Sequence, residues 1–190
     1  MTYVGSGFSR ISSRPWHAPC QSRNVKPRHP VHLAAFDYLG PYRYSLRFAT
    51  SDRRAVFVTT DSVDLVWSQI LRTAGEQAFA VIAYCFMPDH LHLLIEGVTA
   101  DADLRRFVAR AKQCSGFYYA QRTGCRLWQR YGYERVLRSD ELTPVVARYI
   151  LQNPVRAGLV TRLEDYPFLG SGVWTLAQLL GWLAATEAHG

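Results

Sequence analysis

Residues 87–96 read MPDHLHLLIE: two histidines, two places apart, lie in an apolar segment that follows a Pro-Asp pair. In a β-strand, side chains two places apart point to the same face of the sheet, so this run predicts a strand with two different faces. One face carries His90, His92, Leu94 and Glu96, and the other carries Leu91, Leu93 and Ile95. The two imidazoles would lie about 7 Å apart at Cβ, close enough to bind one metal ion. Taken alone, the motif favours a simpler interpretation, in which one histidine is a core residue and the other is exposed.

The segments on either side of this run predict further strands and helices. Alternation of polar and apolar residues predicts a half-buried strand over 42–48, and a continuous apolar run predicts a buried strand over 79–86, followed by a turn at Pro88-Asp89. Apolar residues at helical spacing predict helices over 61–78, with Asp61 or Ser62 as N-cap, and over about 101–121. Residues 126–138 are expected to be extended, with a hairpin as one arrangement.

The last part of the chain predicts two more helices. One begins near Ser139 or at Thr143-Pro144, and ends at Asn153-Pro154 because the residue before a proline resists the helical conformation. Leucines spaced through residues 176–183 predict a short C-terminal helix. The order of elements predicts the α+β class, with an antiparallel sheet covered by helices on one side.

Composition indicates a globular protein with a polyanionic partner. The 190 residues are 48% hydrophobic and 13% aromatic, enough for one domain with a buried core. The net charge is +7, and all basic residues except Lys26 and Lys112 are arginine. Arginine binds two phosphate oxygens at once through its planar fork, although a GC-rich genome would also raise the arginine content. The sign of the charge favours nucleic acid as the partner.

The sequence carries no sign of a membrane segment or of a disulfide framework. No apolar run is long enough to span a membrane and the first residues lack a signal-peptide pattern, so the expected location is the cytoplasm, with no membrane partner. The four cysteines are scattered without a C-x-x-C pair, which predicts free thiols.

Three segments are expected along the chain. Residues 1–35 hold five basic residues and no acidic one among many Ser, Pro and Gly, which predicts a basic, flexible extension. A nucleic-acid-binding arm, a disordered leader and a misplaced start codon all fit this extension. Residues 36–170 form the expected domain, and 171–190 the C-terminal helix.

A tyrosine and an asparagine near the end of the third predicted helix are four residues apart and share one helix face. If Tyr149 and Asn153 pack against the histidine face, the site holds two imidazoles, one amide oxygen and one phenol. Three protein ligands with open positions are typical of a catalytic metal site, and the phenol would be the nucleophile. On the residues alone, a core tyrosine and an ordinary helix-ending asparagine are favoured.

Three motifs together resemble the single-tyrosine HUH transposase superfamily, and most closely the REP-associated tyrosine transposases with their IS200-like transposase domain. These motifs are residues 87–94, Leu127-Trp128-Gln129, and 149–160, which reads YILQNPVRAGLV. The similarity runs from about Tyr42 to Phe168. It implies a ferredoxin/RRM-like HUH endonuclease core.

The resemblance also implies roles for individual residues. His90 and His92 match the metal-binding histidines, Tyr149 matches the nucleophile, and Asn153 matches the polar residue that completes the metal site. Other tyrosines rank below Tyr149 as nucleophiles; they are Tyr118, Tyr119, Tyr131 and Tyr133.

The implied activity is metal-dependent nicking and strand transfer of single-stranded DNA through a 5′-phosphotyrosine, with Mg²⁺ or Mn²⁺ as the cofactor. The alternatives are a domesticated, non-catalytic nucleic-acid-binding protein on the same fold, and an α+β protein with a structural zinc site through His90 and His92. The zinc site would need two more soft ligands, and Cys85 is the only cysteine nearby in the sequence. The resemblance leaves open whether the protein acts as a homodimer.

A basic and aromatic segment is the expected surface for single-stranded or hairpin DNA. Residues 104–139 hold nine basic residues against one acidic residue, Glu134, with seven aromatic residues among them. Arginine for phosphates and aromatic rings for bases are typical of a single-strand groove. The candidate contacts are Arg105, Arg110, Lys112, Arg126, Trp128, Gln129 and Arg130.

Overall fold

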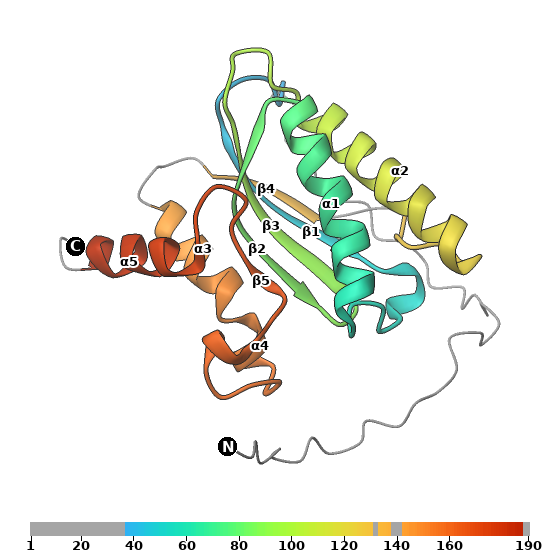
Figure 1. The fold of residues 1–190 in the computed structure, drawn as a ribbon. Coiled ribbons are helices and arrows are strands. Elements are labelled where there is room, and N and C mark those ends of the chain that lie inside the picture. The colour runs from blue at the N-terminus through green and yellow to red at the C-terminus, as the bar shows by residue number, and fades with distance from the viewer. Residues whose placement is uncertain (1–36, 131–132, 138–141, 188–190) are drawn as a thin grey trace, which may run out of the picture.

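A five-stranded antiparallel sheet forms the centre of the molecule (Figure 1). The computed structural model describes residues 37–130, 133–137 and 142–187, so the expected extension over 1–35 lies outside the described residues. The strands are β1 (Arg43–Ala49), β2 (Phe79–Met87), β3 (His90–Gly97), β4 (Tyr133–Leu137) and β5 (Leu169–Gly170), in the spatial order β4-β1-β3-β2-β5. The helices are α1 (Thr60–Glu76), α2 (Leu104–Thr123), α3 (Leu142–Leu151), α4 (Asn153–Arg156) and α5 (Leu176–Glu187), with short 3₁₀ turns η1 (Ser51–Arg53) and η2 (Leu163–Asp165). The predicted α+β class is confirmed.

The histidine strand lies at the centre of this sheet. β3 pairs with β1 on one side and with β2 on the other, and the Pro88-Asp89 turn joins β2 to β3 as predicted. His92 is opposite Arg47 of β1 and Cys85 of β2. Because neighbouring strands keep opposed residues on one face, all three lie on the same side of the sheet.

Helices α1 and α2 cover the face opposite the histidines. This face buries the β3 residues Leu91, Leu93 and Ile95 in one core cluster with residues of both helices. The N-cap of α1 is Thr59, whose side chain accepts from the backbone N–H of Ser62, so the prediction of Asp61 or Ser62 as cap was wrong by two or three residues. Gly124, with φ of +70°, ends α2 in the left-handed conformation that glycine adopts at no steric cost.

Helices α3 and α5 cover the other face, so the prediction of helices on one side only was wrong (Figure 1). Leu94 of β3 is buried there with Ile150 of α3 and Leu179 of α5. The sequence held a signal for this second layer: β2 is apolar throughout, and a strand that is apolar on both faces needs cover on both. A bulge between Val81 and Ala83 helps to bury Ile82 in this second cluster.

Two boundaries in the C-terminal half differ from expectation. Residues 126–138 do not form a hairpin in the part that the structure describes, because β4 pairs with β1 and Trp128 forms a separate bridge with Thr50. Helix α3 begins by Leu142, so Thr143 lies within its first turn; the other predicted start, Ser139, lies outside the described residues. The chain continues as α4 from Asn153 after a break at Gln152, and the C-terminal helix is present as α5.

Among the described residues, no helix has both the length and the apolar character needed to cross a lipid bilayer.

Candidate active site

The two predicted histidines face each other at the start of β3. Their Nε2 atoms are 3.0 Å apart and their ring centroids 4.8 Å apart. At this distance the two nitrogens share a hydrogen bond, in which one ring donates and the other accepts. Binding of one divalent ion by both nitrogens would replace this hydrogen bond, because a ligating nitrogen carries no proton.

Burial keeps both imidazoles in the form that binds metal. His92 is 9% exposed and His90 is half-buried. Burial lowers the pKa of His92 to about 3, with the neighbouring His90 and Arg47 lowering it further. The pKa of His90 is also lowered, mainly by burial and against the effect of Asp89. Neutral imidazole is the ligating form, so the site needs no deprotonation step at neutral pH.

This burial predicts that acid destabilises the metal-free protein partly through His92. The unfolded chain binds a proton at His92 below a pKa of about 6.5, while the folded protein resists protonation down to about 3. Between these two pH values the unfolded state binds more protons than the folded state. The free energy of unfolding therefore decreases as the pH is lowered from about 6.5 to about 3, by up to a few kcal/mol. The Tm of wild type relative to that of His92→Gln, measured in chelator from pH 7 to pH 4, should therefore decrease. A constant difference would contradict the lowered pKa.

Asp89 holds His90 in place and was not predicted as a site residue. Its Oδ1 is 2.6 Å from Nδ1 of His90, and its Oδ2 is 2.7 Å from Nε of Arg53. The backbone of this turn is also fixed, because the Asp89 carbonyl accepts from the N–H and the hydroxyl of Thr50. A carboxylate on the far nitrogen of a metal-binding imidazole fixes the ring and makes it a better ligand.

Asp89→Asn is expected to weaken Mn²⁺ binding by about 10–100-fold, because the amide is a weaker partner for both His90 and Arg53. Calorimetric titration with Mn²⁺ would measure the change. Asp52→Asn is the matched control, since it removes the same charge from η1 and Asp52 bonds to Ser51 rather than to a histidine. Equal Mn²⁺ affinity in Asp89→Asn and wild type would exclude this role for Asp89.

Tyr149 lies beside the histidine pair. Helix α3 packs on the histidine face of the sheet, and the Tyr149 ring meets His92 edge-on, with centroids 6.4 Å apart. The side chain is 47% exposed, so Tyr149 is not the core tyrosine of the alternative interpretation. The guanidinium of Arg156, in α4, lies over its ring at 4.6 Å. A phenol with access to solvent, a cation above it and a pair of imidazoles beside it can approach a phosphodiester.

Asn153 is placed by its amide nitrogen. Nδ2 donates to the carbonyls of Tyr149, at 2.8 Å, and Ile150, at 3.2 Å, which satisfies two acceptors at the end of α3. This arrangement leaves Oδ1 as the atom that Asn153 could offer to a metal. These two hydrogen bonds tie Asn153 to α3, the helix that carries Tyr149, across the break at Gln152.

The competing nucleophiles are less suitable. Tyr118 and Tyr119 are on α2, which covers the opposite face of the sheet, and Tyr119 is buried. Tyr131 and the side chain of Tyr133 lie outside the described residues.

The surroundings of Cys85 do not favour the alternative of a structural zinc site. Cys85 is opposite His92, but its sulfur lies in the apolar cluster beside the Met87 sulfur, at 3.8 Å. Burial raises the pKa of the Cys85 thiol to about 12, which disfavours the thiolate that zinc requires. Among the described residues there is no group of three or more His, Cys, Asp or Glu side chains placed to bind a metal.

Two of the predicted DNA contacts, Trp128 and Lys112, make contacts within the protein. Trp128 is 4% exposed, packs against Phe48 and Phe57, and donates from Nε1 to Ser115 Oγ at 2.8 Å, so the expectation that it contacts DNA was wrong. Lys112 donates from Nζ to the carbonyls of Gln129 and Arg130 and thus braces their loop. Burial lowers the pKa of Lys112 to about 8.

The remaining predicted contacts divide into two groups. Arg105 and Arg110 are exposed on α2, and the structure does not bring them to the histidine face. Gln129 donates its backbone N–H to Ala49, which is opposite His90, so Arg126, Gln129 and Arg130 lie at the end of the sheet where the site is. Arg126 donates to the carbonyl of Trp128.

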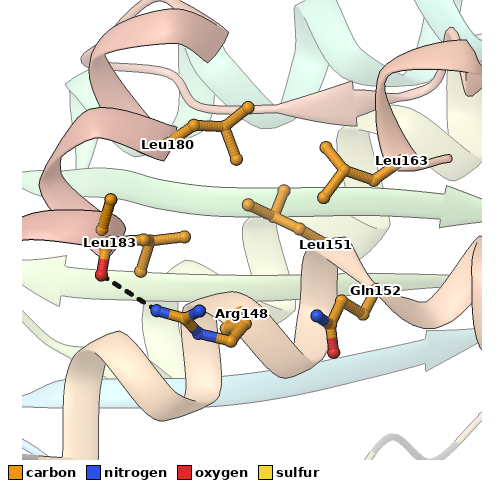
Figure 2. Close-up of a pocket in the computed structure, with 7 residues that line it drawn as sticks. Arg148, Leu151, Gln152, Leu163, Leu180 and Leu183 are labelled. Carbon is orange, nitrogen blue, oxygen red and sulfur yellow. Dashed lines mark hydrogen bonds between the residues drawn. The ribbon is translucent and has the colours of Figure 1, made fainter. Parts of the chain in front are cut away.

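A small pocket lies between α3 and α5, the two helices that pack on the histidine face of the sheet. It has a volume of about 120 Å³ and is lined by residues of α3, η2 and α5 and by Gln152, between α3 and α4 (Figure 2). Arg148 donates to the carbonyl of Leu183 across it, at 2.9 Å. Tyr149, His90 and His92 do not line this pocket, so it is separate from the candidate reacting groups.

The chain is similar to known proteins in both sequence and fold. The family described as transposase IS200-like matches residues 41–153. A Haemophilus influenzae protein described as a REP-associated tyrosine transposase is 26% identical over 136 residues, covering 66% of this chain and 77% of that protein. The structure of a REP-associated tyrosine transposase bound to a REP hairpin matches with a TM-score of 0.61 at 20% identity, over 77% of this chain and 82% of that one. At that identity the likeness establishes the fold.

Proposed function

Because this chain belongs to the family of IS200-like transposases, we propose that it nicks and rejoins single-stranded DNA through a covalent 5′-phosphotyrosine at Tyr149. The observation that carries the proposal is the position of Tyr149, 47% exposed and edge-on to a histidine whose Nε2 faces that of a second histidine. The Tyr149 ring contacts His92 and Arg156, but nearly half of the residue stays open to solvent. This exposed phenol suits an attack on a phosphodiester.

The covalent step exchanges one phosphodiester for another. Tyr149 Oη forms a bond to phosphorus as the bond from phosphorus to O3′ breaks, so the phenol loses its proton and the released 3′-hydroxyl gains one. The phosphodiester energy stays in the Tyr149–DNA link. A second 3′-hydroxyl can then attack phosphorus and release the tyrosine, which rejoins strands without ATP.

His90, His92 and Oδ1 of Asn153 are the groups that would hold a divalent ion. Bound Mg²⁺ or Mn²⁺ would polarise the scissile phosphate and favour the developing charge. Mn²⁺ accepts mixed nitrogen and oxygen ligands more readily than Mg²⁺, so we expect it to support the higher activity.

The substrate that we propose is a single strand, with a DNA hairpin next to the cleaved position. The related structure contains a REP hairpin, and the chain has a net charge of +7. A phosphate-led interface loses affinity steeply as salt rises, by about 10³–10⁵ between 50 mM and 200 mM for six to ten contacts.

The test is formation of a protein–DNA adduct on strands taken from the DNA that flanks the gene. Purified protein is incubated with Mn²⁺ and each strand, labelled at either end, and the products are separated on denaturing gels. Because tyrosine would retain the 5′-phosphate, a label 3′ of the cut should travel with the protein and a label 5′ of it should not. Tight binding without any adduct would instead favour a domesticated, non-catalytic binding protein.

A further inference from the structure

Arg47 is the residue of β1 that lies directly opposite His92. Its side chain is on the histidine face of the sheet, and the residue is half-buried. Two other arginines near this face serve for comparison. Arg43, at the far end of the same strand, is 2.8 Å from Glu96, and Arg53 is 2.7 Å from Asp89.

Arg47 differs from both because it makes no hydrogen bond or ion pair with any residue that the structure describes. The positive charge of Arg47 nevertheless acts on the two histidines. Arg47 contributes to the lowered pKa of both His90 and His92. Burial and the charge of Arg53 lower the pKa of Arg47 itself, while Asp89 and the Tyr149 phenol act in the opposite direction. The guanidinium is therefore within electrostatic range of the histidine pair and of the Tyr149 hydroxyl.

A half-buried cation without a partner is costly, and such groups are normally paired. A phosphate is the group that would complete this one, since the planar fork of arginine can donate to two phosphate oxygens at once. The proposed reaction brings a phosphate to this position, between Tyr149 and the histidines.

We propose that Arg47 is a catalytic residue that binds the non-bridging oxygens of the scissile phosphate while Tyr149 attacks. This inference rests on the proposed function. In the step itself the Tyr149 Oη–P bond forms and the P–O3′ bond breaks, and Arg47 stays protonated and donates hydrogen bonds to the two non-bridging oxygens. Arg156 also lies over the Tyr149 ring, at 4.6 Å, but it is exposed, whereas Arg47 is half-buried opposite His92.

The experiment is a double-mutant cycle between Arg47 and the charge of the phosphate. Wild type and Arg47→Gln are each assayed for the rate of adduct formation on two strands, one natural and one with a neutral methylphosphonate at the scissile position. Arg47→Lys keeps the positive charge but removes the planar guanidinium that can bind two oxygens at once. Arg72→Gln is the matched control, because it removes one positive charge from α1, on the other face of the sheet. Tm values and affinity for an uncleavable strand are measured for each variant.

On the natural strand we expect Arg47→Gln to slow adduct formation about 10²–10³-fold, with Arg47→Lys between it and wild type. On the methylphosphonate strand the two proteins should differ less than tenfold, because the charge that Arg47 binds is gone. Additive effects, with the same fold-loss on both strands, would overturn the proposal, since a merely structural residue behaves in that way. An adduct in wild type with no loss in Arg47→Gln would also overturn it and leave the proposed function standing. No adduct in wild type on any strand would instead reject the proposed function, and this inference with it.

Discussion

Replacing Tyr149 with Phe is expected to abolish the protein–DNA adduct and to leave DNA binding nearly unchanged. The substitution removes one oxygen from an exposed side chain and keeps the ring that meets His92 and lies beneath Arg156. Loss of a nucleophile lowers the rate by orders of magnitude, and we expect at least about 10³-fold here. Denaturing gels with end-labelled strands measure the adduct, and a gel-shift assay measures the affinity, which should stay within about threefold because the phosphate contacts that dominate affinity are intact.

Tyr118→Phe is the control for this experiment. Tyr118 is 38% exposed, also on a helix, but α2 lies across the sheet from the histidines. Tyr118→Phe should therefore form the adduct at the wild-type rate. An adduct that persists in Tyr149→Phe would assign the nucleophile to another tyrosine, and Tyr131 and Tyr133 would be the next to test.

Replacing His92 with Gln is expected to remove metal-dependent cleavage. Its Nε2 faces that of His90 at 3.0 Å, so losing it halves the imidazole set that would hold the ion. Because a bound metal contributes several kcal/mol to the transition state of phosphoryl transfer, the rate should fall about 100-fold or more. Wild type in chelator should show the same loss and recover when Mn²⁺ is added, whereas His92→Gln should not recover.

The two histidines are expected to act as a unit. The double variant His90→Gln/His92→Gln should therefore be little slower than His92→Gln alone, since either change already disables the site. Rates are compared at saturating Mn²⁺, with Tm values to confirm folding. Full activity of wild type in chelator, or multiplicative losses in the double variant, would argue against a shared metal ion.

The prediction from sequence succeeded where the pattern is local. Alternation in residues 90–96 separated a histidine face from a leucine face, and both faces are present in the fold. The i, i+4 spacing of Tyr149 and Asn153 predicted that these residues are neighbours, and across the junction of α3 and α4 the Asn153 side chain does bond to the Tyr149 carbonyl. Each conclusion depends on the geometry of one element, which a few consecutive residues determine.

Prediction failed where the environment comes from another element. Trp128, between Arg126 and Arg130, resembled a surface aromatic residue, but its bridge to Thr50 turns the ring into the core. Lys112 resembled a phosphate contact, yet its ammonium bonds to the loop that holds Gln129. Neither pairing has a signal in the nearby sequence, because each joins segments that are distant along the chain.

The sequence by itself determined the class of the fold, the histidine strand, the tyrosine helix and the family, since local periodicity and short motifs encode all of these. Only the tertiary structure decided that α3 covers the histidine face, that Asp89 holds His90, and that Arg47 lies opposite His92 without a partner among the described residues. The physical reason is strand register: which residues oppose each other across a sheet depends on the burial of both faces together, and no single strand contains that information.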